Sequence, residues 1–243
     1  FSTMNFLPFI FNLFFSLYFG SMPISQKPDP CEEARTGAAA ATEFAKDSLY
    51  HLALAKIKNA FVFDKKEHCV SFGKDVAGNM IASSILSGGN TSGKVPAIAN
   101  AFADLHNHPN NLPPDAGDFY GLLDINKNNP VYNKRFVVTK AGTVYALLVT
   151  DIAAALEFIK KHPPQPPAFV GGPPGFAVAI TDEAREMKYG FNCTDEMVLA
   201  FILQKYNTGV SLLKQNSNGS FNKITTTFLK QGNQLFFKAG SCP

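Results

Sequence analysis

Apolar and polar residues alternate differently along the chain, which separates a helical N-terminal part from a strand-rich middle. Residues 31–60 are rich in Ala, Glu, Lys and Leu, and their apolar positions recur at helical spacing. This pattern predicts one long helix. The short strands expected after it, each bounded by turn-forming residues, cover 61–63, 67–73, 80–86 and 97–108. Together these strands are typical of a β-meander.

The pattern continues with alternating helices and strands up to residue 161. A helix is expected over 119–125, followed by a hairpin of strands 135–139 and 143–150 around a glycine-containing turn. Another helix fits 151–161, and Asp151 is placed to cap its first turn. The region 31–162 is therefore interpreted as one main domain.

A segment rich in proline and glycine, 163–175, interrupts this pattern, because proline is excluded from helix interiors and central strands. It is interpreted as a linker. Beyond it, 181–213 is mostly helical in pattern, with breaks at Gly190 and Gly209, and a closing hairpin is expected at 221–229 and 234–238. The region 176–243 is either a small accessory unit or an elaboration packed on the main domain.

The first thirty residues, 1–30, form a separate apolar segment and linker. Residues 6–19 are almost entirely apolar and precede a polar, proline-containing stretch. This run is shorter than the ~20 residues of a membrane span and fits the core of a signal peptide. However, no Lys or Arg precedes it and no clear small-x-small cleavage site follows it. A hydrophobic strip from an upstream domain is the alternative, and no stable membrane span is expected.

Composition and charge exclude some classes of function. The chain is 46% hydrophobic and 17% charged, which is typical of a folded protein rather than a disordered one. The net charge of +3 is small and the lysines are scattered, so no nucleic-acid partner is expected. The four cysteines form no C-x-x-C pair, and two disulfides or four free thiols are both open. An even cysteine count after a signal-like segment favours a secreted or periplasmic location.

The strongest chemical signal is the sequence His106-Asn107-His108-Pro109. Residues two apart on a strand face the same way, so His106 and His108 would present both imidazoles to one point, and Pro109 would end the strand. Asp115 is a natural N-cap for a helix that begins near residue 116. Asp118 would then lie in the first turn of this helix, where side chains lean back toward the helix N-terminus and toward the histidines.

Two histidines and one carboxylate fit a catalytic zinc site, because they leave a coordination position open for water. Zinc lowers the pKa of its water to roughly 7, and a nearby carboxylate can then accept the proton. Glu67, in a strand upstream, is our candidate for this general base. Spacing alone does not separate Glu67 from Asp75 or Asp104.

These residues resemble the JAMM or MPN-type (JAB-domain) zinc metalloproteases, whose pattern is a Glu in an early strand, then His-x-His-Pro, then Ser-x-x-Asp. The resemblance covers roughly 60–160; the element at 106–109 matches fully, whereas 67–73 matches only loosely. It implies a curved mixed β-sheet flanked by helices, an α+β fold, here with a C-terminal helix-plus-hairpin extension. It also implies Zn²⁺ held by the ligands His106, His108 and Asp118, with Glu67 orienting and deprotonating the water.

The resemblance further implies a hydrolase of peptide or isopeptide bonds. Members of the family cleave the tails of ubiquitin-like proteins or peptide bonds in small bacterial substrates such as cell-wall peptides, and some cleave nothing. The chain is also similar, more loosely, to secreted or toxin-associated JAB-like domains of bacteria. A catalytically weak interaction or effector module of a larger secreted polypeptide is therefore the second class of function.

One departure from the family pattern concerns its serine, which helps to stabilise the oxyanion and is replaced here by Asp115. A carboxylate is a poor oxyanion donor unless it is protonated, and loss of one such donor typically costs ~10²–10³ in rate. Asp115 is thus either part of a catalytic site or only a helix cap.

Each candidate also has an ordinary structural interpretation. His106 and His108 would otherwise lie in a polar surface loop before a proline, and Asp118 would be a first-turn acid favoured by the helix dipole. Glu67 would otherwise be an exposed strand charge. His68 faces away from Glu67 on a strand and is interpreted as structural.

Overall fold

The computed structural model describes residues 30–90, 93–170, 172–232 and 234–242. The apolar segment expected to be signal-like therefore lies outside the described residues, apart from residue 30. Among the described residues, no helix combines the length and apolar character needed to cross a membrane.

Helices and strands alternate along the described chain. The helices are α1 (Pro30–Ala45), α2 (Ser48–Phe63), α3 (Ala116–Asn128), α4 (Ile152–Lys161), α5 (Val178–Arg185) and α6 (Asp195–Lys205), with a π-helical turn η1 (Glu186–Gly190) after α5. The strands are β1 (His68–Lys74), β2 (Met80–Ala82), β3 (Leu86–Ser87), β4 (Ala103–Asn107), β5 (Lys134–Val138), β6 (Val144–Val149), β7 (Val210–Gln215), β8 (Phe221–Gln231) and β9 (Gln234–Cys242).

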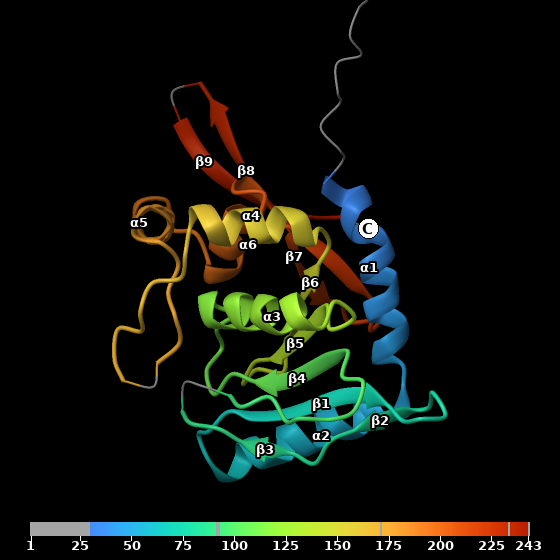
Figure 1. The fold of residues 1–243 in the computed structure, drawn as a ribbon. Helices are drawn as coiled ribbons and strands as arrows, with labels where there is room; N and C mark the ends of the chain where they lie inside the picture. Colours follow the sequence, from blue (N-terminus) through green and yellow to red (C-terminus); the bar gives the residue numbers. More distant parts are fainter. Residues whose placement is uncertain (1–29, 91–92, 171, 233, 243) are drawn as a thin grey trace, which may run out of the picture.

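The strands form one nine-stranded sheet in the order β2-β1-β4-β5-β6-β7-β8-β9, with β3 paired to β1 (Figure 1). The pair β4–β5 is parallel, and the other strand pairs are antiparallel. Helices flank the sheet, so the mixed α+β fold predicted from the sequence is confirmed.

Helices cover both faces of the sheet. One core lies between the sheet and the helices α1 and α2, and includes Tyr50, Phe72, Leu105 and Phe136. The other lies between the sheet and α3 to α6, and includes Phe119. Because successive strand residues point to opposite faces, each central strand contributes to both sides of the sheet.

The N-terminal half differs from the predicted elements in several ways, and the strand predicted at 80–86 is two short strands, β2 and β3. The single helix predicted over 31–60 is two helices, because Asp47 leaves the helical conformation and its side chain accepts a hydrogen bond of 2.7 Å from the backbone N of Leu49, capping α2. The strand predicted at 61–63 is wrong, since these residues end α2. The predicted meander is also wrong, because a meander pairs each strand only with the strands next to it in the chain. Instead, β1 lies between β2 and β4 in the sheet and also pairs with β3.

The middle of the chain follows the prediction more closely. The helix around 119–125 and the hairpin β5–β6 are present. The Asp151 cap is confirmed, since its carboxylate accepts a 3.0 Å hydrogen bond from the backbone N of Ala154. The long strand predicted at 97–108 is shorter, because regular pairing begins only at Ala103.

The C-terminal region 176–243 continues the same sheet. Strand β7 pairs with β6, and the hairpin β8–β9 extends the sheet further, as Figure 1 shows. The helical pattern predicted over 181–213 is wrong at its end, where residues 210–213 lie in β7. Gly209 makes this change of direction, with φ +66° and a position for a Cβ only 1.9 Å from the carbonyl O of Asp151.

The sequence left open two disulfides or four free thiols, and the structure has one disulfide and two free thiols. Cys31 and Cys242 form a disulfide with a Cα–Cα distance of 5.4 Å, whereas Cys69 and Cys193 are buried free thiols. The disulfide joins the start of α1 to the end of β9. A secreted or periplasmic location stays a prediction, with which this bond is compatible.

Candidate metal centre

Strand β4 carries the centre of the candidate site. Its residue Leu105 points into the core beside α1 and α2, so Asp104 and His106 face the opposite side, toward α3. On the neighbouring antiparallel strand, Cys69 pairs with His106 and so has its side chain on the same face. The i, i+2 spacing therefore places functional groups on one face of the sheet, as predicted.

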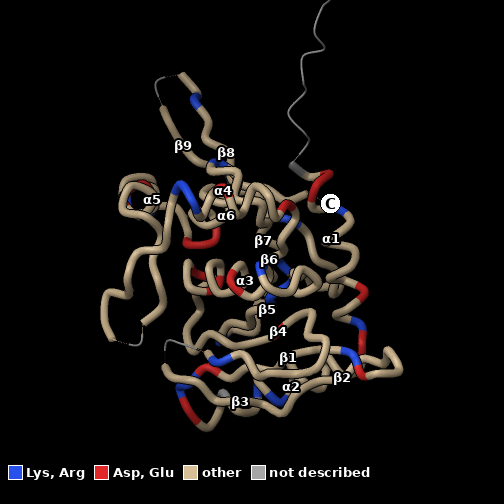
Figure 2. Tube along the Cα trace, in the orientation of Figure 1, with Lys and Arg blue, Asp and Glu red and all other residues tan. Residues whose placement is uncertain are grey.

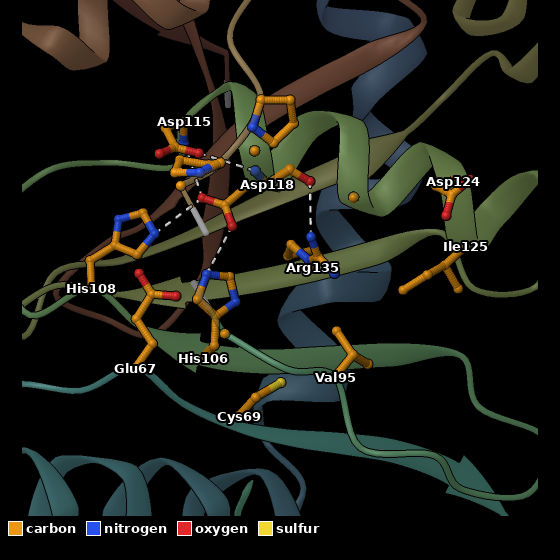
Figure 3. A pocket seen from close by; sticks show the side chains of 16 residues that line it. Glu67, Cys69, Val95, His106, His108, Asp115, Asp118, Asp124, Ile125 and Arg135 are labelled. Carbon is orange, nitrogen blue, oxygen red and sulfur yellow. Dashed lines mark hydrogen bonds and ion pairs between the residues drawn. The ribbon is translucent and has the colours of Figure 1, made fainter. Parts of the chain in front are cut away.

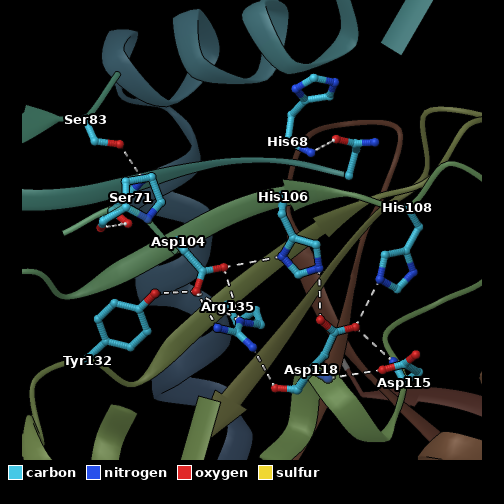
Figure 4. A network of polar contacts seen from close by, with 12 residues as sticks. His68, Ser71, Ser83, Asp104, His106, His108, Asp115, Asp118, Tyr132 and Arg135 are labelled. Carbon is cyan, nitrogen blue, oxygen red and sulfur yellow. Dashed lines mark hydrogen bonds and ion pairs between the residues drawn. The ribbon is translucent and has the colours of Figure 1, made fainter. Parts of the chain in front are cut away.

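The three predicted metal ligands meet at one point (Figure 4). The Nε2 atom of His106 lies 2.9 Å from Oδ1 of Asp118, and Nε2 of His108 lies 3.1 Å from Oδ2 of the same carboxylate. One potential ligand atom from each residue lies within 4.8 Å of the others. All three residues are buried, with exposed fractions of 5%, 7% and 8%. The alternative of a polar surface loop is contradicted.

The opposite ring nitrogens of both histidines face acceptors. The Nδ1 atom of His106 lies 3.4 Å from Oδ1 of Asp104, and Nδ1 of His108 lies 3.2 Å from the carbonyl O of Leu112. An acceptor at Nδ1 favours a proton there and leaves the Nε2 lone pair free to bind a cation. Both rings are thus oriented with Nε2 toward Asp118.

Asp104, one of the alternative bases, is the centre of a buried network instead. The guanidinium of Arg135 donates to Oδ2 of Asp104 from Nε and Nη2, both at 3.0 Å, and the hydroxyl of Tyr132 donates a short hydrogen bond to the same oxygen. Nη1 of Arg135 donates to the carbonyl O of Asp118 at 3.1 Å. This network ties β4 and β5 to the first turn of α3 (Figure 4). The sequence reasoning missed both partners of Asp104.

Asp115 caps α3, as predicted. Its Oδ1 accepts a 3.1 Å hydrogen bond from the backbone N of Asp118, and Oδ2 of Asp118 accepts a 3.0 Å bond from the backbone N of Asp115. This reciprocal capping box fixes the backbone and the carboxylate of Asp118. Burial, and then the charge of Asp118, raise the pKa of Asp115. The structure places Asp115 in the pocket but shows it in a capping role.

Glu67 lies directly before β1 and borders the same pocket as the two histidines (Figure 3). Its exposed fraction is only 8%, so the interpretation as an exposed strand charge is contradicted. Burial raises its pKa, against the opposing effect of His106 and His108. A raised pKa brings a carboxyl group closer to the neutral range in which it can both accept and donate a proton. Asp75, the other alternative, instead holds a turn through hydrogen bonds to Asn79.

The charges of this cluster are interdependent. Burial would lower the pKa of His106, but Asp118 and Asp104 outweigh it and raise that pKa to about 10. Burial would raise the pKa of Asp118, but the two histidines hold it well below its usual value. The carboxylate of Asp118 therefore stays ionised, and its negative charge attracts protons to the imidazoles or, in their place, a cation. Two imidazole nitrogens and one carboxylate oxygen at one point are also the donor set of catalytic zinc sites, so these residues fit the ion.

A cavity of about 350 Å³ opens beside these ligands. Two glycines of α3, Gly117 and Gly121, line one wall and allow Pro173 and Arg135 to pack closely on the helix. The segment 163–175, predicted as a linker, contributes another wall through residues 172–174. It packs closely on α3, since a Cβ at Gly117 would lie 2.5 Å from Cβ of Pro173.

His68 does not contribute to this cavity. Its Nε2 lies 2.8 Å from Oδ1 of Asp64 and its Nδ1 lies 3.1 Å from Oγ of Ser87, away from the metal ligands. The structural role expected for His68 is confirmed.

Comparisons with known proteins do not extend this description. No family model, no curated protein and no solved structure matches the chain. The resemblance to the JAMM-type pattern thus depends on the residues quoted for it, and the assignment of function depends on the geometry of the site.

Proposed function

We propose that this protein is a zinc-dependent hydrolase of peptide or isopeptide bonds. The observation that carries the proposal is the convergence of the two Nε2 atoms of His106 and His108 on the carboxylate of Asp118, inside a cavity that also holds Glu67. A purely structural zinc site is normally closed by four protein ligands. Three ligands beside an open cavity favour catalysis.

In this proposal His106, His108 and Asp118 would hold Zn²⁺, which would supply Lewis acidity toward water and the substrate carbonyl. Glu67 accepts a proton from the attacking water as the water oxygen bonds to the carbonyl carbon. When the C–N bond breaks, Glu67 returns this proton to the leaving nitrogen, which departs as an amine. The products are a carboxylic acid and an amine, which at neutral pH ionise to a carboxylate and an ammonium group, and Glu67 is regenerated as a carboxylate.

A second candidate function is a JAB-like binding module with weak or no catalysis. The capping box favours it, because the Oδ1 atom of Asp115 already accepts a backbone hydrogen bond where the family pattern has an oxyanion-stabilising serine. Under this alternative the cavity binds a peptide segment without cleaving it.

Metal content tests the proposal first. The full chain, purified without a metal-binding tag, should contain about one zinc per chain by inductively coupled plasma mass spectrometry. The His106→Ala/His108→Ala variant should contain none. The same measurement separates zinc from iron, which also binds two histidines and one carboxylate. Absence of zinc from both proteins after incubation with zinc would contradict the hydrolase.

Replacing Asp115 by serine separates the two candidate functions. Serine also caps helices, so the fold should be preserved. If Asp115→Ser raises hydrolysis of a fluorogenic peptide by about 10²-fold or more, the natural chain lacks an oxyanion donor and is mainly a binding module. If the same change abolishes hydrolysis, Asp115 belongs to a working catalytic site. Circular dichroism of both proteins controls for folding.

The distribution of charged residues gives no indication of a nucleic-acid partner. In Figure 2 acidic and basic residues are interspersed along the trace rather than gathered on one element. Such a distribution is unlike the basic face that nucleic-acid binding needs. Whether the peptide is a ubiquitin-like tail or a cell-wall peptide is addressed by substrate screening with the zinc-loaded protein.

A further inference from the structure

We propose that the end of the cavity remote from His108 binds a basic side chain with an aliphatic stem, such as lysine. This inference rests on the proposed function for its biological meaning, because it names the class of peptide that the hydrolase would take. The residues that carry it are Val95, Asp124 and Ile125, which border the same cavity as the metal ligands. In Figure 3 they lie together on the side away from His108 and Glu67.

The wall of this part of the cavity is partly apolar, and Arg135 also lines the cavity. Val95 and Ile125 are partly buried and pack against the core beneath α3. They are therefore held in place and still present apolar surface to the cavity. Gly121, one turn before Ile125 on α3, carries no side chain, and the guanidinium of Arg135 packs against it, with Nη1 only 2.7 Å from the position of a Cβ. Such walls suit the methylene groups of a long side chain, which gain from leaving water.

The charge at the rim of this part is negative. Asp124 is exposed, and within the described part of the chain its carboxylate has no ion-pair or hydrogen-bond partner. The nearby cation Arg135 does not compensate it, because its guanidinium is committed to Asp104 and to the carbonyl O of Asp118. Apolar side chains and an unpaired carboxylate in the lining of one cavity fit an aliphatic stem that ends in an ammonium or guanidinium group.

Other ligand classes fit this arrangement less well. An acidic side chain would place its carboxylate beside Asp124 and would be repelled. A purely aliphatic side chain would use the walls but would leave the carboxylate without a partner. A small amine would reach the carboxylate but would bury little apolar surface. The combination of stem and cation uses both features.

Binding of blocked amino acids tests this inference without turnover. The protein as purified is titrated with the N-acetyl, N-methylamide derivatives of lysine, norleucine and glutamate, followed by heteronuclear NMR. Norleucine keeps an aliphatic stem and lacks the charge. We expect lysine to bind about threefold more tightly than norleucine, the size of an exposed ion pair, and glutamate to bind more weakly than both. The advantage of lysine should shrink in about 0.5 M salt.

Two variants test whether the preference for lysine depends on Asp124. Asp124→Asn should abolish the preference for lysine over norleucine while it leaves norleucine binding unchanged. Glu157→Gln is the matched control, since it removes one exposed acidic charge from α4, where Glu157 pairs with Lys161. This control should keep the preference. Equal binding of lysine and norleucine to the parent, or a preference that survives Asp124→Asn, overturns the inference.

The outcome is independent of the proposed function. A chain that retains no zinc but prefers lysine at Asp124 has the basic-side-chain site without the hydrolase. A chain that binds zinc and cleaves peptides but treats lysine and norleucine alike is a hydrolase without this site. If zinc is bound and the preference is present, peptides with lysine next to the cleaved bond should be hydrolysed about threefold faster than their norleucine counterparts, at limiting concentration.

Discussion

The two faces of strand β4 contrast sharply in chemistry. Toward α1 and α2, Leu105 lies in a core of apolar side chains and is completely buried. Toward α3, the adjacent residues Asp104 and His106 are equally removed from water but belong to a continuous polar network. The apolar face needs only close packing. On the polar face every buried group needs a partner, since an unpaired one would be costly.

This difference explains how the site is held. Asp104 is satisfied by Arg135 and Tyr132 and in turn faces the ring of His106, while Arg135 reaches the backbone of Asp118. The metal-binding atoms are thus positioned by groups that are themselves fixed. Changes on the polar face should therefore affect function, stability or both, whereas changes on the apolar face should affect stability alone.

The largest expected effect is on catalysis, from Glu67→Gln. The amide keeps the shape of the side chain but cannot accept the proton of the attacking water. Hydrolysis of a fluorogenic peptide should fall by roughly 10²–10⁴-fold, with zinc content and thermal unfolding close to those of the parent. Loss of zinc together with activity would instead identify Glu67 as a ligand.

Next in size is the stability effect of Asp104→Asn. This change leaves the buried guanidinium of Arg135 without its counter-charge, which should lower the free energy of unfolding by about 3–5 kcal/mol in urea denaturation. In the double variant with Arg135→Gln the combined loss should be smaller than the sum of the two single losses. Additive losses would show that the ion pair contributes little.

The same pair gives a pH dependence. Burial would raise the pKa of Asp104, but Arg135 and then His106 hold it below the usual value. The stabilising contribution of the carboxylate is therefore complete above the ordinary carboxyl pKa of about 4 and is lost as the pH falls through the lower folded value. The difference in stability between the parent and Asp104→Asn should accordingly narrow in acid.

On the apolar face, Leu105→Ala should lower the free energy of unfolding by about 2–5 kcal/mol, because it leaves a cavity between the sheet and α2. Its immediate neighbours on β4 keep their partners. The folded fraction should thus bind zinc as the parent does, as measured by metal content after removal of unfolded protein. Loss of zinc from well-folded Leu105→Ala would mean that the two faces are coupled.

The smallest effect should come from Ile57→Val in α2, a fully buried position of the same core. Removal of one methyl group typically costs about 0.5–1.5 kcal/mol. Zinc content and peptide hydrolysis at 25 °C should be unchanged. A change in either would again contradict the separation of the two faces.

Much of the site could be predicted because it is local in sequence. His106 and His108 share a face through the two-residue period of a strand. Asp115 caps the helix α3, and Asp118 lies three residues later in its first turn. The choice of Glu67 as the candidate general base could not be made from local sequence, because the pairing of β1 with β4 brings it near His106. The resemblance to a family pattern selected it, not its spacing.

Other features depend on contacts distant in the sequence. Arg135 and Tyr132 meet Asp104 across 31 and 28 positions, and no local period indicates these pairs. The prediction of a linker over 163–175 relied on the backbone properties of proline, which give no information about where this segment packs. In the same way, the apolar residues at 61–63 are compatible with a strand or a helix, and in the structure they continue the helix α2.

The disulfide between Cys31 and Cys242 gives the chain a closed covalent path, so that the backbone from one to the other is topologically a ring. A single cut anywhere on this ring, for example in the proline-rich wall of the cavity, would leave both fragments joined. Under reducing conditions the same cut would give two pieces held only by the shared sheet. A circularly permuted chain that links residues 31 and 242 directly and begins in the proline-rich wall should therefore keep the same fold, with its new ends beside the metal centre.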